Sequence, residues 1–279
     1  MTIEPRAAIR PVRDGSHVQV VPQGKFGRLK RRRGRRQLIY APGLFLKIGR
    51  TDSERQMIAR EAGAAQAAAR HAFWEDLPIK AYRILHHGVV ERRGRPATTE
   101  DFDPLVDVVE SHLESALAYP PTDAIEGIER RPLFDSLDED ERRGLSAATR
   151  SLQLPRTSMH GDVHVFNFVF VGDAPRLVDW EFFDSDGSFV YDYLDFFISV
   201  TSINSDDPWH VIMRRLRASH PALVAVAARL DLAPQALLAY YLFLKTNTIM
   251  SLQGSFTTGD ERFFNDHMAG LRRTLDAMA

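Results

Sequence analysis

Three side chains with oxygen donors lie on one short stretch in the second half of the chain. Asp162 follows His160 and Gly161, Asn167 comes a few positions later, and Asp179 ends the next apolar run. A carboxylate can accept or orient the proton of an attacking hydroxyl, and amide and carboxylate oxygens are the ligands that Mg²⁺ prefers. These are the groups that phosphoryl transfer from a nucleotide to a hydroxyl requires.

The spacing of these residues sharpens that interpretation. The pattern His-x-Asp-x-x-x-x-Asn, from His160 to Asn167, matches the kinase catalytic loop, in which the aspartate is the base and the asparagine binds a metal ion. A downstream aspartate at the end of a short strand is the second metal ligand that this chemistry needs, and Asp179 stands at such a place. We therefore predict Asp162 as the catalytic base, and Asn167 and Asp179 as the ligands of Mg²⁺.

The motifs around these residues resemble those of the aminoglycoside phosphotransferase and choline kinase superfamily. The His-Gly-Asp of residues 160–162, with a second histidine at His164, is that superfamily's form of the catalytic loop. The Asp-Trp-Glu of residues 179–181 is similar to its metal-binding motif and differs from the Asp-Phe-Gly of protein kinases. The small-molecule branch of the kinases is therefore favoured over the protein kinases.

A further element extends the resemblance, which covers residues 25–200. Gly187 followed by Asp192 is similar to a superfamily element whose aspartate is expected to anchor the catalytic loop. The resemblance implies an α+β, two-lobed protein-kinase-like fold, with a small N-terminal antiparallel sheet lobe and a larger, mainly helical C-terminal lobe. It also implies a phosphotransferase that uses ATP, or GTP, with Mg²⁺ and that phosphorylates a hydroxyl of a small molecule.

The resemblance also assigns nucleotide-binding residues in the N-terminal half. Lys47 is on the predicted third strand, where the superfamily places the lysine that binds the α- and β-phosphates, and Glu61 on the next helix is its expected ion-pair partner. Glu54 is the alternative partner, but an acid in the first helical turn is explained by the helix dipole alone. The loop over the phosphates has one glycine, Gly34, so the arginines of 31–36 could bind phosphate oxygens instead.

Alternation, capping and turn signals predict the elements that carry these residues. The N-terminal half should contain a helix at 53–72 and strands or extended segments at 26–33, 37–40, 44–48, 79–90 and 97–104. Helices should follow at 105–118, 133–153, 188–203, 208–218, 221–230, 234–251 and 261–278, with one hairpin made of 165–171 and 176–179. We place the two lobes at residues 1–101, of which 1–16 could be a tail, and 102–279.

Composition limits the classes of function. The 279 residues are 44% hydrophobic and 26% charged with a net charge of -1, which is ordinary for a folded globular protein and excludes a globally basic nucleic-acid binder. The absence of cysteine excludes disulfides, thiolate metal sites and cysteine nucleophiles. No apolar run is long enough to cross a bilayer, and the N-terminal residues lack a secretory pattern. We expect a cytoplasmic protein with no nucleic-acid partner.

Two alternatives remain beside the small-molecule kinase. His160, Asp162 and His164 alternate in sequence, so on a strand they would face the same way and could bind the metal of a hydrolase. That function leaves Asn167 and Asp179 without a role. The second alternative is a pseudokinase scaffold without turnover, which the complete set of predicted catalytic residues disfavours.

The acceptor is predicted from the mixture of charges beyond residue 180. The acids there are Asp184, Asp186, Asp206, Asp207, Asp260 and Asp266, and the basic residues that oppose a strong preference for cations are Arg262, Arg272 and Arg273. Neutral hydroxyls can pair with both carboxylates and guanidinium groups, whereas a polycation would leave charges unpaired. We therefore expect a sugar-like acceptor in preference to choline or a polycationic aminoglycoside.

Overall fold

A computed structural model describes residues 29–32, 36–41, 44–49, 52–74, 76–78, 81–84, 88–92, 94–203, 207–252 and 260–278. The chain forms two compact units, and each is built from two stretches of sequence. The N-terminal unit combines the residues up to Thr98 with Phe166–Phe183, and the C-terminal unit combines Thr99–Val165 with Asp184–Ala279. The first unit contains the larger sheet and the second is mainly helical, so the α+β, two-lobed fold class is confirmed.

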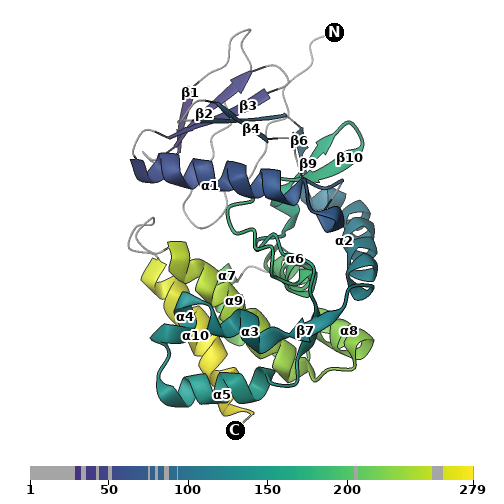
Figure 1. Cartoon of the computed structure of the whole chain (residues 1–279), viewed down its shortest axis with the longest axis vertical. Helices are drawn as coiled ribbons and strands as arrows, with labels where there is room; N and C mark the ends of the chain where they lie inside the picture. The colour runs from purple at the N-terminus through teal and green to yellow at the C-terminus, as the bar shows by residue number, and fades with distance from the viewer. Residues whose placement is uncertain are drawn as a thin grey trace. The chain divides into compact units, whose positions relative to one another are not determined.

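The N-terminal unit is built on a five-stranded antiparallel sheet with the order β1-β2-β3-β5-β4. Its strands are β1 (Leu29–Arg32), β2 (Arg36–Ala41), β3 (Leu44–Gly49), β4 (Ala81–Ile84) and β5 (Gly88–Arg92). Helix α1 (Asp52–Ala68) packs against β3, β4 and β5 and runs across one face of the sheet (Figure 1). The segment predicted as one strand at 79–90 is a hairpin, because the chain reverses so that Ile84 pairs with Gly88.

A second, three-stranded sheet belongs to the same unit. Its strands are β6 (Arg95–Pro96), β9 (Phe168–Val171) and β10 (Ala174–Leu177), in the order β10-β9-β6. The predicted hairpin is present, and its turn uses Gly172 at a φ of 67°, which glycine adopts at little cost. The first strand begins at Phe168 rather than at Val165, because Val165–Asn167 forms a 3₁₀ turn.

The β9–β10 hairpin belongs to the N-terminal unit although it lies late in the sequence. Strand β9 pairs with β6, and the buried rings of Trp74 and Trp180 meet edge to face with their centroids 5.2 Å apart. The predicted boundary between residues 101 and 102 lies beside the Thr98–Thr99 division, but the prediction left the hairpin in the C-terminal lobe. Long-range pairing and aromatic packing place it in the N-terminal unit.

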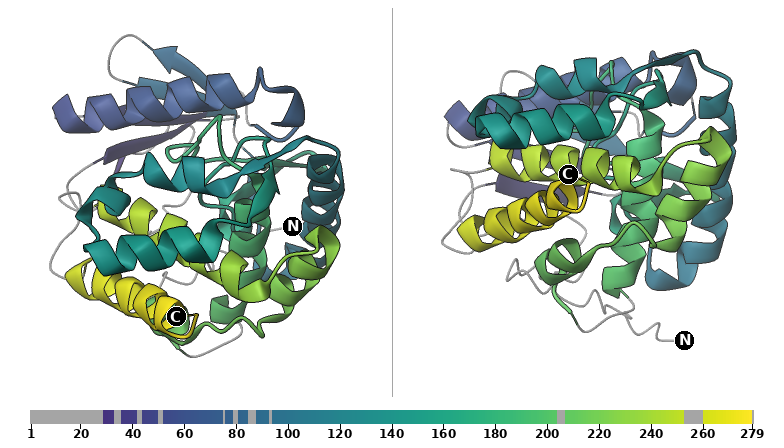
Figure 2. Two further views of the ribbon diagram at one scale, coloured as in Figure 1. Left: turned by 60° about the horizontal axis from the view of Figure 1, so that its bottom comes forward. Right: turned by 90° about the horizontal axis from the view of Figure 1, so that it is seen from below.

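The C-terminal unit contains a two-stranded sheet of β7 (Pro121–Asp123) and β8 (Gln153–Pro155) among helices. The helices are α2 (Phe102–Leu117), α3 (Ala124–Glu129), α4 (Pro132–Ser136), α5 (Glu139–Thr149), α6 (Phe189–Ile203), α7 (Trp209–Arg215), α8 (Pro221–Leu230), α9 (Pro234–Leu252) and α10 (Asp260–Asp276). Helix α9 is apolar on all sides from Ala236 to Leu244, and every residue in that range is buried. It therefore lies at the centre of the unit, packed against α3, α4, α5, α6, α8 and α10 (Figure 2).

Two predicted elements of this unit differ from the structure. The helix predicted at 133–153 is interrupted after Ser136, because Asp138 forms a capping box with Glu141 and so begins a new helix, α5. The extended segment predicted at 97–104 becomes a 3₁₀ turn and the start of α2. Pro104 lies in the first turn of that helix, where a missing N–H costs no intrahelical hydrogen bond.

No single helix in the described part of the chain is long and apolar enough to span a bilayer. Helices α8 and α9 together have the length and apolar composition of a membrane span, but a bend of 115° separates them.

Candidate active site

The predicted catalytic loop, residues 160–167, is fixed by an aspartate on helix α6. Asp192, in the first turn of α6, accepts hydrogen bonds from the backbone N–H groups of His160, at 2.7 Å, and Gly161, at 2.8 Å. Burial raises the pKa of Asp192, and these two hydrogen bonds oppose the rise. The anchor that the family resemblance implied is therefore present.

Two glycines shape this loop, one through its backbone conformation and the other by allowing a close contact. Gly161 has a φ of 89°, a backbone conformation that residues other than glycine rarely adopt. This explains why glycine stands between His160 and Asp162. A Cβ on Gly187 would lie 2.5 Å from the Cγ of Met159. Gly187 thus lets the chain before α6 approach the strand-like segment that leads into the loop, where Met159 and Asp184 exchange backbone hydrogen bonds of 2.9 Å.

Asp162 is held between two nitrogen-bearing side chains. Its Oδ1 accepts a hydrogen bond of 3.0 Å from the Nζ of Lys245, and its Oδ2 lies 3.4 Å from the Nε2 of His164. Burial would raise the pKa of Asp162, but the charges of Lys245 and His164 and their hydrogen bonds lower it well below its usual value. The carboxyl group is therefore ionised at neutral pH and fixed in orientation.

Lys245 is itself held by a second buried carboxylate. Its Nζ lies 2.9 Å from the Oδ2 of Asp195 on α6, and Asp195 also accepts a hydrogen bond of 2.8 Å from the hydroxyl of Tyr241. The Nζ lies 5.6 Å from the ring centroid of Trp209, within the range of a cation–π interaction. Burial would lower the pKa of Lys245, but Asp195 and Asp162 raise it well above its usual value, so the ammonium is kept.

The sequence analysis missed Lys245 and Asp195. The available signal was a charge inside an otherwise apolar helix: Lys245 follows the run from Ala236 to Leu244, and Asp195 stands between Leu194 and Phe196. Because a buried charge needs a partner of opposite sign, each residue indicated that an oppositely charged residue lies nearby in the fold. The identity of the partner depends on how α6 and α9 pack.

The geometry does not support the hydrolase alternative. His160 is fully buried, and its Nδ1 lies 3.3 Å from the backbone nitrogen of Asp162, so the ring faces the loop's own backbone. Among the described residues no group of three or more histidine, aspartate or glutamate side chains could hold a metal ion. His164 has a defined contact, but it is with Asp162 and does not form a shared metal site with His160.

The predicted magnesium ligands lie in the N-terminal unit. Asn167 is buried at the end of the 3₁₀ turn before β9, and its backbone carbonyl accepts a hydrogen bond of 3.0 Å from Val178, the residue before Asp179. Asp179 has a φ of 61°, in a region that costs a non-glycine residue about 1–3 kcal/mol and that is concentrated at functional sites. An amide and a carboxylate oxygen suit Mg²⁺, which takes one or two protein carboxylates and keeps several waters. The two residues fit the ion, and their assignment stays a prediction.

The structure describes Glu61 and the backbone of Lys47 among the predicted nucleotide-binding residues. Lys47 is on β3, with its backbone paired to Leu38 on one side and Val89 on the other. Glu61 is on α1 and is 1% exposed, which distinguishes it from an ordinary solvated helical glutamate. Gly34 and the side chain of Lys47 lie outside the described part of the chain, so their roles stay predictions.

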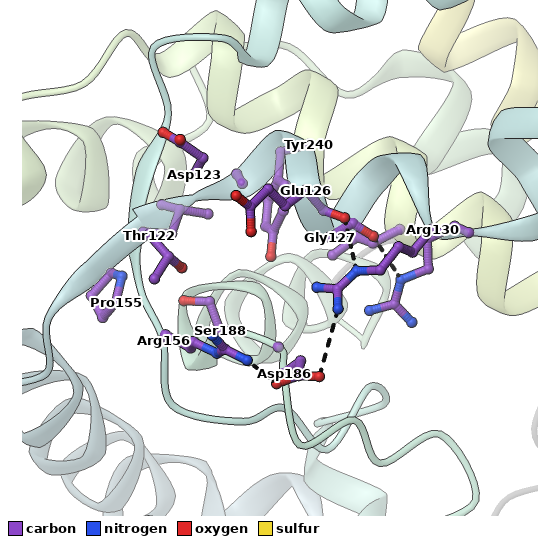
Figure 3. A pocket seen from close by; sticks show the side chains of 15 residues that line it. Thr122, Asp123, Glu126, Gly127, Arg130, Pro155, Arg156, Asp186, Ser188 and Tyr240 are labelled. Carbon is purple, nitrogen blue, oxygen red and sulfur yellow. Dashed lines mark hydrogen bonds and ion pairs between the residues drawn. The ribbon is translucent and has the colours of Figure 1, made fainter.

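A separate polar pocket lies elsewhere in the C-terminal unit. It is a cavity of about 260 Å³ lined by α3, the two-stranded sheet and the chain before α6. Arg130 and Arg156 both pair with Asp186, as the dashed lines in Figure 3 show, and Arg131 pairs with Asp184. The arginines of this pocket are therefore paired with aspartates of the protein.

No family model matches the chain, and no curated protein sequence is similar to it. Solved structures of similar fold include a thermostable mutant of aminoglycoside phosphotransferase APH(4)-Ia in complex with ADP and hygromycin B, with a TM-score of 0.58 and 11% identity over 91% of this chain and 94% of that one. The choline kinase LicA from Streptococcus pneumoniae has a TM-score of 0.51 and 14% identity over 93% and 95% of the two chains. Plasmodium vivax ethanolamine kinase has a TM-score of 0.50 and 13% identity over 89% and 82%.

At these identities the comparisons concern architecture, and the match runs over nearly the whole of each chain. The chain therefore has the two-lobed fold shared by aminoglycoside phosphotransferases and by choline and ethanolamine kinases.

Proposed function

We propose that this chain is an ATP- and Mg²⁺-dependent phosphotransferase that phosphorylates a hydroxyl group of a small molecule. The observation that carries the proposal is an ionised Asp162, on a loop anchored by Asp192, a few residues before a buried Asn167. The fold supports the same function, because solved structures that share it include small-molecule kinases, one of them crystallised with ADP.

The low pKa of Asp162 fits one particular role in the reaction. Phosphoryl transfer passes through a loose transition state, so the protein contributes mainly positioning and electrostatic stabilisation. A carboxylate with a lowered pKa is a weak base in the resting enzyme, but it is ionised and so can accept a charge-assisted hydrogen bond from the hydroxyl of the substrate. Asp162 would orient the nucleophile and take its proton late, when the oxygen has become more acidic.

The N-terminal unit would bind the nucleotide. Lys47 would bind the phosphates and pair with Glu61, and Asn167 and Asp179 would hold Mg²⁺ through their side-chain oxygens. Bound there, Mg²⁺ would neutralise charge on the phosphates. GTP could replace ATP without any change in these roles. Because ATP is a cytoplasmic metabolite, the cytoplasm is the compartment in which we expect the enzyme to act.

The acceptor is proposed to be sugar-like. Four of the six acids that could bind a polycation have arginine partners: Asp184 with Arg131, Asp186 with Arg130 and Arg156, Asp207 with Arg215, and Asp266 with Arg214. Asp206 and the side chain of Asp260 lie outside the described part of the chain. These pairs leave polar groups with matched charge, which suit neutral hydroxyls better than a multiply charged ligand.

The test is a nucleotide-consumption screen with purified protein, ATP or GTP, Mg²⁺ and a panel of sugars, amino sugars, choline, ethanolamine and aminoglycosides. We expect acceptor-dependent turnover with at least one member, loss of turnover in excess chelator, and a product whose mass has increased by one phosphoryl group. Full activity in excess chelator would contradict the metal assignment. Nucleotide binding without transfer to any acceptor would favour the pseudokinase scaffold.

A further inference from the structure

Lys245 is an unusual residue for the centre of a helical unit. Its side chain is 9% exposed, and it follows directly on the buried apolar run of α9. Removing an ammonium from water is costly, and the cost is offset only by close, well-formed partners. Apolar residues of similar volume are often as stabilising as a buried ion pair, so packing alone does not account for a charge at this position.

The partners of Lys245 are arranged to keep it in place. Asp195 is 1% exposed, and its two carboxylate oxygens are used by Lys245 and by the Tyr241 hydroxyl. The ring of Trp209 lies near the ammonium. The ammonium of Lys245 therefore donates one hydrogen bond to the buried Asp195 and another to the Oδ1 of Asp162.

This arrangement changes what Asp162 can bind. A carboxylate beside the reacting hydroxyl would ordinarily attract a positively charged acceptor, since opposite charges a few ångströms apart favour each other strongly in a partly buried site. Here the cation is already supplied by the protein, 3.0 Å from Oδ1, and His164 lies beside Oδ2. A second cation at Asp162 would be placed next to an ammonium, whereas a neutral hydroxyl would gain an acceptor without that repulsion.

We propose that Lys245 is a specificity-determining residue, whose buried ammonium takes the cation position beside Asp162 and so restricts the acceptor to hydroxyls without a positive charge nearby. The proposal rests on the proposed function, because it concerns the acceptor side of the same site. It adds a rule of selection: like-charge repulsion at Asp162 rejects choline, ethanolamine and amino sugars that carry the ammonium next to the reacting hydroxyl.

Three variants test this rule. Lys245→Ala leaves a space bounded by the Asp162 and Asp195 carboxylates and the Trp209 ring. The double change Lys245→Met with Asp195→Asn removes the ammonium together with its buried counter-charge, which protects against misfolding, and the Asn side chain can still accept from Tyr241. Lys245→Arg keeps the charge and is the matched control.

The first measurement is the ratio of kcat/KM for a neutral sugar to that for choline. We expect the wild-type enzyme and Lys245→Arg to favour the neutral acceptor, and the double variant to lose ~10-fold or more of that preference, since 1.4 kcal/mol of removed repulsion is tenfold. An unchanged ratio in a folded double variant would overturn the proposal.

The second measurement does not depend on turnover. Calorimetric titration with methylammonium and with choline should show tighter, saturable binding to Lys245→Ala than to the wild-type protein, or to the double variant if the single one does not fold. Binding would support the assignment of a cation position even if the wild-type protein phosphorylated no acceptor, a result that would refute the proposed function alone. No gain in affinity in either variant would refute the role of Lys245.

Discussion

Two clusters of aspartates and basic residues lie in the C-terminal unit, and they differ in burial. In the exposed cluster, which lines the polar pocket, the side chains of Arg156 and Asp186 are 51% and 41% exposed. In the buried cluster the side chains of Lys245 and Asp195 are 9% and 1% exposed. The residue types are nearly the same, yet water screens the first pair and is excluded from the second.

The difference in burial separates two uses of ion pairs. Exposed pairs contribute about 0–1 kcal/mol to folding and can be lost with little effect. A buried pair is costly to form and much more costly to break, because the partner that remains is an uncompensated charge. The exposed cluster can therefore serve solubility and local order, whereas the buried cluster carries the larger cost and holds Asp162, the proposed catalytic base. The predictions below test this contrast, beginning with the largest effect.

The largest effect on turnover is expected from Asp162→Asn. The amide keeps the shape of the carboxyl group but cannot accept the proton of the nucleophile, so kcat should fall by ~10² or more while nucleotide binding survives. Steady-state kinetics with an acceptor found in the screen would measure it. The matched control is Asp140→Asn in the first turn of α5, where the carboxylate is 90% exposed. Similar kcat values for Asp162→Asn and the control would remove Asp162 from the mechanism.

The largest effect on stability is expected from Lys245→Met. It leaves the fully buried Asp195 without its cation, and breaking such a pair costs about 3–5 kcal/mol. Adding Asp195→Asn should restore most of the free energy of unfolding, since the charge left behind is then removed as well. Denaturant unfolding at pH 7 compares the proteins. Equal stability of the single and double variants would show that the two charges are not coupled.

A buried histidine on α10 gives a smaller, pH-dependent effect. Burial lowers the pKa of His267 to about 3, against the ordinary value of 6.5, and its Nδ1 lies 2.7 Å from the backbone carbonyl of Phe263. Between these two pKa values the unfolded chain binds a proton that the folded protein does not, so stability falls as the pH falls below 6.5. From pH 7 to pH 5 this amounts to about 2 kcal/mol.

The comparison for that prediction is His267→Asn, whose side-chain amide can replace the Nδ1–H donor. Unfolding free energies of both proteins at pH 7 and pH 5 should show that the wild-type protein loses about 2 kcal/mol more than the variant. Parallel losses would mean that His267 is protonated in the folded state. Other titrating groups are common to both proteins and cancel in the difference.

The smallest effect is expected in the exposed cluster. Arg156→Ala removes a guanidinium from Asp186, which keeps Arg130 nearby, so the unfolding free energy should change far less than in Lys245→Met. The change should shrink further in high salt, because exposed charges are screened. A loss as large as that of Lys245→Met would show that burial does not separate the two clusters.

Local patterns in the sequence are enough to nominate most of the residues of the proposed site. Asp162, Asn167 and Asp179 fall within one short stretch, so a motif can present them without knowledge of the fold, and the anchor at Asp192 is close enough to be recognised with them. The helices α6 and α8 were also placed well, because their apolar periodicity and Gly or Pro boundaries are local signals.

Other features depend on contacts between distant parts of the chain or on competition between local signals, so the sequence patterns did not predict them. The contact between Lys245 and Asp162 joins residues 83 positions apart and depends on how α9 meets the loop. The break between α4 and α5 depends on one capping box, which competed with a continuous helical pattern. The assignment of the β9–β10 hairpin to the N-terminal unit depends on its pairing with β6, which no property of the hairpin's own sequence specifies.

That pairing has a consequence for any attempt to divide the protein. Because the chain leaves the C-terminal unit after Val165 and re-enters it at Asp184, neither unit is one continuous polypeptide. In a fragment that ends at Thr98, Trp74 would lack the ring of Trp180, and β6 would lack its partner strand β9. Fragments divided at Thr98 should therefore fold poorly when expressed alone. A cut at the Gly172 turn keeps β6 and β9 on one fragment, so it is the position that the architecture favours for co-expression and fragment complementation.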